Sequence, residues 1–400
     1  MDHFFTELGR TVLGRWKAQN FSLAAFPEIA RGALEERPPA KHVELSSLIR
    51  EFLLDDEQPF QTQSGFGQPE LVVYDDPRFY IQILFWLEGT TDIHQHKFSG
   101  AFHVLEGSSI HSHFAFEQAQ SISAHLRVGQ LRMTDTKLLQ IGSTMPIVSG
   151  RGYIHSLFHL DTPSLTVVVR THTDPGTGPQ FTYLPPHLAV DPFHHDALTT
   201  RRKQLLDVLE RTEDPSYPAL VLEMIGNLDF ERGFFILQNC MSCLRSLGAW
   251  EETWNAFQQK HGALAEYVAL TLDEIVRRDG IAAFRSAITE IEHRFFLALL
   301  LNVPGRADIL NMVAQRFPGA ASATIVRWAE ELASGTWLLD AEFPANVAVS
   351  RGKEPEVFVA ALRHFLEAGD IANGSSVLSA ADLERLRAAF ARSSLRALVS

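Results

Sequence analysis

The N-terminal part of the chain alternates apolar and polar residues with the period of an α-helix. Apolar residues recur every three or four positions over residues 2–18 and again over residues 44–54, which predicts two amphipathic helices. The first stripe comprises Phe4, Phe5, Leu8, Val12, Leu13 and Trp16, and the second comprises Leu45, Leu48, Ile49, Phe52 and Leu53. Between them Pro38 and Pro39 interrupt the pattern, because proline does not continue a helix.

Near residue 70 the pattern changes to short runs of β-branched and aromatic residues. The predicted strands cover residues 71–74, 79–86, 103–105, 110–116, 130–133, 138–141 and 164–170. Glycines punctuate these runs at Gly107, Gly129, Gly142 and Gly150. Many short strands separated by glycine turns are typical of a β-sandwich or a β-barrel.

The second half of the chain has a helical pattern. Residues 173–195 are rich in proline, glycine and histidine, which predicts a linker. From residue 196 onward apolar residues recur at helical spacing. A chain of 400 residues is longer than one hydrophobic core usually serves. We therefore expect an α+β protein with two domains: a β-barrel domain at 1–195, which includes the N-terminal helices, and an all-α domain at 196–400.

Composition and charge argue against two classes of protein. The formal net charge is −13 and no run of lysine and arginine stands out, so a nucleic-acid-binding protein is not expected. The longest apolar run, Phe295 to Leu301, is far shorter than the ~20 residues that span a bilayer. No signal-peptide pattern follows Met1. We expect a cytoplasmic protein without a membrane span.

The candidate chemistry begins with the pair His94 and His96. On a strand, residues two apart point to the same face, so both imidazoles would lie on one face with their Cα atoms about 6.6 Å apart. Two such rings can share one metal ion at about 2.0–2.1 Å from each nitrogen. A third ligand must come from a distant segment. The best candidate is His155, in the segment Gly150-Arg151-Gly152-Tyr153-Ile154-His155, whose glycines permit a tight approach.

These residues resemble two motifs of the cupin superfamily. The first motif is a His-x-His pair, a glutamate three or four residues later and a glycine six residues beyond it. These spacings count the residues in between. Here three residues separate His96 from Gly100, which stands in place of the glutamate, and six residues separate Gly100 from Gly107. The second motif contains glycine, histidine and asparagine, whose places are taken by Gly152, His155 and His159. The resemblance implies a double-stranded β-helix barrel with a metal held by His94, His96 and His155.

Without the glutamate, the site resembles the three-histidine centre of the cysteine dioxygenase (thiol dioxygenase) family. The likeness extends over Trp86-Leu87-Glu88-Gly89 and Val104-Leu105-Glu106-Gly107 and covers about half the chain. It implies a mononuclear Fe(II) dioxygenase that takes O₂ and a small anionic substrate. Three neutral imidazoles leave the ion its full positive charge, which also favours an anionic ligand.

Several residues depart from that family or are left with open roles. The family's carboxylate-binding arginine has no match near Pro69 and Glu70, and Arg170 stands where the family has a tyrosine. Arg170, Lys97 and Arg151 are candidates for orienting a substrate carboxylate. Tyr153 and His159, together with Arg170, form the set of residues for which we predict catalytic roles. His111 and His113 form a second His-x-His pair that would line the pocket, support the barrel or compete as ligands.

Two alternative functions stay open. The first is a cupin with zinc or nickel that acts as an isomerase or a hydrolase. The second is a small-molecule sensor without turnover, whose helical domain contacts a partner protein or a second copy of the chain.

Two further motifs are expected to have structural rather than catalytic roles. Cys240 and Cys243 form a CxxC pattern, but they lie within a helical run and are expected to pack as small apolar residues. Glu290 and His293 have the i, i+3 spacing of di-iron helical bundles, which need two such pairs. With one convincing pair, an ion network on a helix surface is the expectation.

Overall fold

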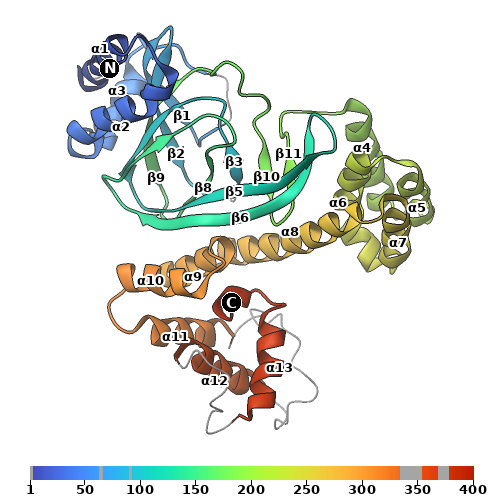
Figure 1. Ribbon diagram of the computed structural model, residues 1–400. Helices are drawn as coiled ribbons and strands as arrows, with labels where there is room; N and C mark the ends of the chain where they lie inside the picture. Colours follow the sequence, from blue (N-terminus) through green and yellow to red (C-terminus); the bar gives the residue numbers. More distant parts are fainter. Residues whose placement is uncertain (1–2, 63–65, 90–91, 334–353, 368–377) are drawn as a thin grey trace.

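The computed structural model describes residues 3–62, 66–89, 92–333, 354–367 and 378–400. Figure 1 shows three parts in chain order: N-terminal helices, a β-barrel and a long helical region. The N-terminal helices are α1 (His3–Ala18), α2 (Phe26–Glu36) and α3 (Leu45–Leu54). The two predicted helices correspond to α1 and α3. Helix α2 was not predicted, because its buried stripe includes the small residues Ala30 and Ala33 rather than a row of large apolar ones.

The barrel is built from two sheets. The strands are β1 (Glu70–Asp76), β2 (Phe79–Trp86), β3 (Ile93–Gln95), β4 (Gly100–Glu106), β5 (Ser109–Ser121), β6 (Leu126–Leu139), β7 (Thr144–Ile147), β8 (Ile154–His159), β9 (Ser164–Thr171), β10 (Thr182–Leu184) and β11 (Leu188–Val190). One sheet has the order β1-β2-β9-β4-β7, and the other is the closed ring β10-β11-β6-β5-β8-β3. The predicted fold class, an α+β protein with an N-terminal β-barrel and a large helical region after it, is confirmed.

Strand β2 shows why the barrel and the N-terminal helices fold together. All eight of its residues are buried. Alternate side chains of a strand point to opposite faces, and the set Phe79, Ile81, Ile83 and Phe85 packs in one cluster with residues of α1 and α2. Leu84 and Trp86 lie in the cluster inside the barrel. The helices thus cover the outer face of the five-stranded sheet, and the inner face is left for the site.

The prediction of a linker at residues 173–195 is wrong in part. Strands β10 and β11 lie within it, and β10 pairs with both β11 and β3. These pairings close the ring of the second sheet. Two gains stabilise these strands although the composition of the segment is typical of loops. Their backbones hydrogen-bond to neighbouring strands, and Phe181, Tyr183 and Leu188 become buried. Residues 130–133 and 138–141, predicted as two strands, correspond to the single strand β6, which ends at Leu139.

The helical region packs directly on the barrel. Its helices are α4 (Ala197–Arg211), α5 (Tyr217–Asn227), α6 (Phe230–Ser246), α7 (Trp250–His261), α8 (Leu264–Ala287), α9 (Ile291–Asn302), α10 (Arg306–Arg316), α11 (Ala321–Ala333), α12 (Glu354–Glu367) and α13 (Ala380–Phe390). Leu126, Val128 and Leu188 of the barrel belong to one hydrophobic cluster with α4–α8, and Ile110 and Phe158 to another with α8–α13. Within the described residues, every helix is too short or too polar to cross a lipid bilayer.

Polar contacts join the two halves as well. Arg316 of α10 donates hydrogen bonds to Ser108 Oγ at 2.7 Å and to Asp161 Oδ1 at 2.9 Å. Arg285 of α8 donates to the carbonyl oxygen of Leu160 at 3.2 Å. The division of the chain at residue 195/196 therefore falls between parts that share cores and stays a prediction.

Helix α8 lies along the outer side of the barrel (Figure 1). A cavity of about 180 Å³ between them is lined by Ile93 of β3 and Ser156 of β8, and by side chains of α8 and α9. On the helical side, buried Glu274 forms ion pairs with Arg277 at 2.8 Å and with Arg396 at 2.6 Å. The first pair lies within α8, and the second ties α8 to the C-terminal segment.

Candidate metal centre

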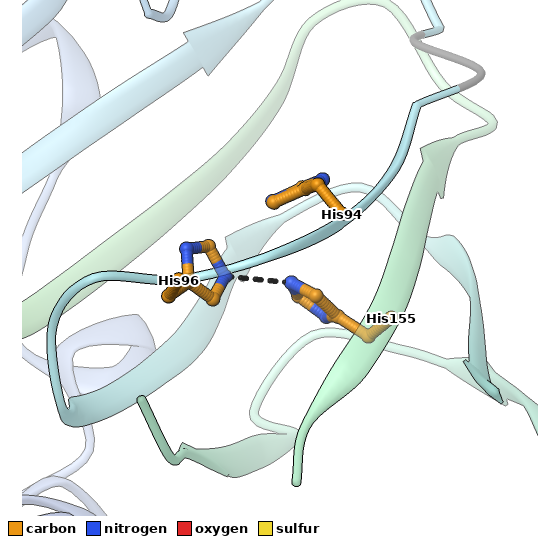
Figure 2. Close-up of side chains that lie close together, drawn as sticks. All are labelled: His94, His96 and His155. Atoms are coloured by element: carbon orange, nitrogen blue, oxygen red, sulfur yellow. Dashed lines mark hydrogen bonds between the residues drawn. The ribbon is translucent and has the colours of Figure 1, made fainter. Parts of the chain in front are cut away.

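His94, His96 and His155 meet on the inner face of the second sheet. His94 lies on β3 and His155 on β8, and these two residues are opposite each other in the antiparallel register. His96 follows β3 and forms a bridge with Ser149, and its carbonyl oxygen accepts a hydrogen bond from Gly150 N at 2.8 Å. The strand pairing thus brings the distant segment around His155 to the His94–His96 pair, as Figure 2 shows.

The three imidazoles are close enough to share one ion. One nitrogen from each ring lies within 4.8 Å of the others. The Nε2 atoms of His96 and His155 are 2.7 Å apart. Two nitrogens at 2.0–2.1 Å from one ion and at right angles to each other would be about 3 Å apart. Among the described residues, this is the group of histidine, cysteine and acidic side chains whose spacing fits a metal ion.

The protonation state also suits metal ligation. Burial lowers the pKa of His94 and holds the pKa values of His96 and His155 well below the usual value. Neutral imidazoles offer the lone pairs that a metal needs. The Nε2 atom of His94 is buried and has no hydrogen-bond partner in the described part of the chain. A buried ring nitrogen without a partner is costly unless a ligand satisfies it. The site therefore fits a divalent metal ion.

Behind the ligands lies a second layer of polar side chains. His111 Nε2 is 3.0 Å from His155 Nδ1, and the hydroxyl of Tyr153 is 3.4 Å from the same His111 atom. The His113 ring packs edge-on against Tyr153 with centroids 4.9 Å apart. Both histidines come from β5, where His113 is opposite His155. His111 thus supports a ligand rather than competing with it.

A small cavity of about 50 Å³ opens beside the three histidines. Most of its lining is apolar or aromatic, from Phe66, Leu84, Trp86, Phe98, Phe102, Ile147, Leu157 and Val168. Its other lining residues are Gln82, Asp92, His94, His96, His155, His159 and Thr166. No lysine or arginine is among the lining residues. The space next to the proposed metal is therefore apolar, with a few polar atoms.

Of the three residues for which sequence predicts catalytic roles, His159 lines this cavity. Its ring stacks on Trp86 with centroids 4.6 Å apart, and its Nδ1 atom is 3.1 Å from Ser109 Oγ. Burial lowers the pKa of His159 to about 3. Its imidazole is therefore neutral at neutral pH. Tyr153 is buried behind the ligands and is not a lining residue.

The basic residues that were predicted to orient a substrate carboxylate do not line this cavity. The Arg170 guanidinium sits 3.4 Å from the centre of the Phe98 ring and 5.1 Å from that of Tyr80. It donates hydrogen bonds to the carbonyl oxygens of Thr171 and His172. Phe98 lines the cavity and Arg170 does not. Arg151 is exposed and Lys97 half-exposed, and neither lines the cavity.

The surroundings of Gly100 explain why this position, where the cupin motif has a glutamate, carries no side chain. Gly100 begins β4 and is opposite Arg170 of β9. A Cβ atom at this position would lie 2.0 Å from the carbonyl oxygen of Val169 and 2.9 Å from the Cα of Arg170. Both neighbours are backbone atoms, which do not move aside easily. The closeness of β4 and β9 thus leaves no room for a side chain.

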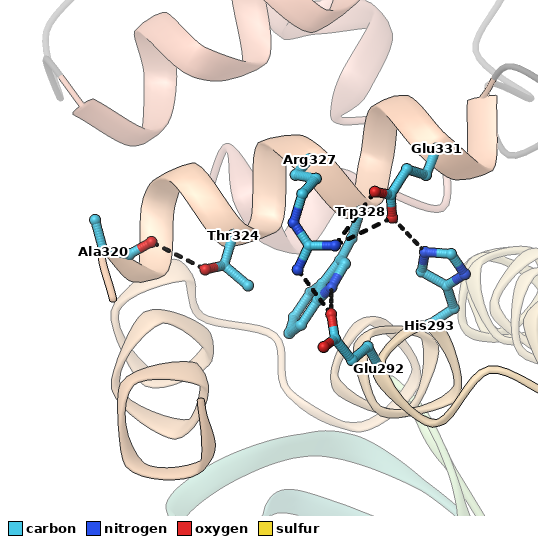
Figure 3. A network of polar contacts seen from close by, with 7 residues as sticks. All are labelled: Glu292, His293, Ala320, Thr324, Arg327, Trp328 and Glu331. Atoms are coloured by element: carbon cyan, nitrogen blue, oxygen red, sulfur yellow. Dashed lines mark hydrogen bonds and ion pairs between the residues drawn. The ribbon is translucent and has the colours of Figure 1, made fainter. Parts of the chain in front are cut away.

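The two remaining motifs are structural. Cys240 and Cys243 are unpaired thiols on α6, and burial raises the pKa of Cys240 to about 11, so it is not a ready nucleophile. Figure 3 shows the surroundings of His293. Its Nε2 atom pairs with Glu331 at 2.8 Å, and Arg327 bridges Glu331 to Glu292. The expected ion network on a helix surface is thus present around His293, and its other members are Glu292, Arg327 and Glu331.

No protein-family model and no curated protein matches the sequence. The solved structures that match include KdgF from Halomonas sp., at 14% identity over 30% of this chain and 91% of that one, with a TM-score of 0.20. A cupin-2 domain protein from Shewanella frigidimarina matches at 14% identity over 33% and 96%, with a TM-score of 0.20. Hydroquinone 1,2-dioxygenase from Sphingomonas sp. matches at 10% identity over 26% and 65%, with a TM-score of 0.20. At such TM-scores, the assignment of a metal centre rests on the geometry of the three histidines.

Proposed function

We propose that this protein is a mononuclear Fe(II) oxygenase, similar in chemistry to thiol dioxygenases, and that His94, His96 and His155 hold the iron. The observation that supports this most is the convergence of three neutral imidazoles, two of them buried and that of His94 half-buried, beside a small apolar cavity. Iron(II) bound there would supply the redox chemistry with O₂, since three protein ligands leave positions open for O₂ and substrate.

The chain's own residues would prepare the site in three ways. The apolar and aromatic lining excludes water from the space beside the ligands. Neutral His159 offers a hydrogen bond to a substrate in the cavity. Tyr153, through its contact with His111, steadies the ring of His155.

Arg170 is proposed to act through its charge. The pKa of His96 is lowered mainly by burial, and further by the neighbouring charges of His94 and Arg170. The positive charge of Arg170 therefore favours the neutral form of His96. The same charge adds to the attraction of the site for an anionic group bound at the metal.

Metal analysis and oxygen consumption test the proposal. Protein purified without oxygen is expected to contain iron near one equivalent and to consume O₂ when a small thiol is added. The variant His96→Ala is expected to lose iron and O₂ uptake while its circular dichroism spectrum is retained, because the barrel core does not depend on that side chain.

The matched control is His172→Ala, since His172 is exposed and lies away from the ligands on the segment after β9. This variant is expected to keep both metal and uptake. Protein that carries zinc or nickel and consumes no O₂ would contradict the oxygenase and favour an isomerase or a hydrolase.

A further inference from the structure

Gln82 lies in the middle of β2, inside the barrel. It is opposite Val72 on one neighbouring strand and Val168 on the other, and it is only 1% exposed. Its side chain lines the same cavity as His94, His96 and His155. This amide therefore shares one small space with the proposed metal ligands.

Neither polar atom of the Gln82 side chain has a hydrogen-bond partner among the described residues. Buried polar side chains are nearly always satisfied, because leaving one without a partner is costly. Packing does not explain this residue either. The neighbouring inward side chains of the strand, Leu84 and Trp86, fill the same interior with apolar surface. The unpaired amide at this position contributes no hydrogen bond to the fold, but it can hydrogen-bond a ligand.

The chemistry of the cavity indicates what kind of ligand group would fit. An amide both donates and accepts hydrogen bonds, so it matches a hydroxyl or another amide at both of its atoms. A carboxylate only accepts and would leave the carbonyl oxygen of Gln82 without a donor. No lysine or arginine lines the cavity to balance a second negative charge, and the one lining carboxylate, Asp92, is exposed.

We propose that Gln82 is the specificity-determining residue of the cavity and that it hydrogen-bonds an uncharged hydroxyl or carboxamide group of a small, otherwise apolar substrate. The inference rests on the proposed function, because the substrate's other polar group would bind the metal. It deepens that function by stating that the negative charge of the substrate is confined to the group at the metal.

A series of small thiols separates these roles. The protein is reconstituted with Co(II) without oxygen, and thiolate binding is followed through the visible absorption of cobalt. The probes are 1-propanethiol, 2-mercaptoethanol, 3-mercaptopropanamide, 3-mercaptopropionate and cysteamine. All share the thiol that binds the metal, and they differ in the second group. The readout is each affinity relative to that of 1-propanethiol, which offers residue 82 nothing to bind.

Gln82→Leu is expected to lower the affinities for 2-mercaptoethanol and 3-mercaptopropanamide, relative to that for 1-propanethiol, by roughly 3- to 10-fold. This is the net effect of one or two hydrogen bonds. Gln82→Glu is expected to shift the preference toward cysteamine, whose ammonium group would pair with the new carboxylate. The control Gln130→Leu, on the exposed part of β6, is expected to leave all relative affinities as they are.

The outcomes distinguish the two levels of the hypothesis. If no thiol changes the cobalt spectrum of the folded protein, the open metal site is wrong, and this inference falls with it. If thiols bind but Gln82→Leu leaves their relative affinities unchanged, the metal site stands and the role of Gln82 is refuted. A loss confined to 3-mercaptopropionate would refute the uncharged group. A marked fall in the melting temperature of Gln82→Leu would show a structural role, whereas the inference expects no fall.

Discussion

The Nε2 atom of His111 lies 3.0 Å from the Nδ1 atom of His155, the ring nitrogen that does not face His96. The two nitrogens of the His155 ring thus have different neighbours. One faces the shared centre and the other faces β5. A partner at the second nitrogen fixes the tautomer and the rotation of a metal-binding ring. His111 therefore prepares His155 for the metal although it does not line the cavity itself.

Removing that partner should weaken metal binding. His111→Leu is expected to lower the metal affinity by about 10- to 100-fold, the range seen when the partner of a ligating histidine is lost. Competition with a chelator of known affinity measures this. His111→Gln keeps a polar atom near His155 Nδ1 and is expected to recover part of the affinity. Equal affinity of wild type and a folded His111→Leu variant would show that the contact does not matter.

Filling the place of the missing cupin glutamate should damage the barrel. Gly100→Ala places a Cβ against the backbone of β9 and is expected to lower the free energy of unfolding by about 3 kcal/mol or more. Gly152→Ala is the control, since nothing lies within 4 Å of a Cβ there. Urea denaturation compares the two variants. A Gly100→Ala protein as stable as the wild type would mean that β4 and β9 separate readily, and a fourth ligand would then be sterically allowed.

Buried histidines should make the fold sensitive to acid. Burial lowers the pKa of His103 to about 4 and that of His159 to about 3. Between the unfolded value of about 6.5 and these folded values, the unfolded chain binds more protons than the folded one. The free energy of unfolding is therefore expected to fall as the pH drops through this window. The fall is at most about 1.4 kcal/mol per pH unit for each histidine.

The variant His103→Leu tests this dependence. His103 contacts Thr144 Oγ1 at 2.8 Å and accepts from Ala40 N at 3.4 Å, so the variant loses stability at every pH. Its stability is nevertheless expected to depend less steeply on pH below 6.5, because one titrating group is gone. Denaturation curves at several pH values give the slope. Parallel slopes for the variant and the wild type would contradict the assignment.

The barrel should not be stable without the helical region. A chain ending at residue 195 would expose barrel residues that the helices now bury: Ile110, Leu126, Val128, Phe158, Leu160, Leu188 and Val190. An apolar surface of this kind drives aggregation. We expect residues 1–195 alone to be insoluble or to melt at a much lower temperature than the full chain. A soluble fragment with an unchanged melting temperature would support the predicted division into two independent domains.

The features that sequence predicts best depend on local periodicity. The stripe from Phe4 to Trp16 is visible because each apolar residue returns to one helix face, and His94 and His96 share a face because they are two apart. Motif spacing predicts the third ligand, His155, and the pairing of β3 with β8 explains why it lies beside His94.

The features that sequence did not reveal depend on distant contacts. Strands β10 and β11 form because β3 and β6 provide hydrogen-bonding partners for their backbones. The sequence of residues 173–195 by itself does not indicate these partners. Gln82 stands in a run of eight buried residues, so its inward direction emerges only when the helices are seen to cover the other face of β2. Arg170 is on the expected strand, but Phe98 lies between it and the cavity, which spacing along the chain does not show.

The cavity under α8 lies behind two of the proposed metal ligands. Ile93 and Ser156 are among the barrel residues that line it, and each is the chain neighbour of a proposed metal ligand, His94 or His155. Neighbouring residues of a strand point to opposite faces, so the same short segments carry imidazoles inward and line this cavity outward. The outer side of the backbone that carries two of the proposed ligands therefore borders an open space, which α8 and α9 line from the other side.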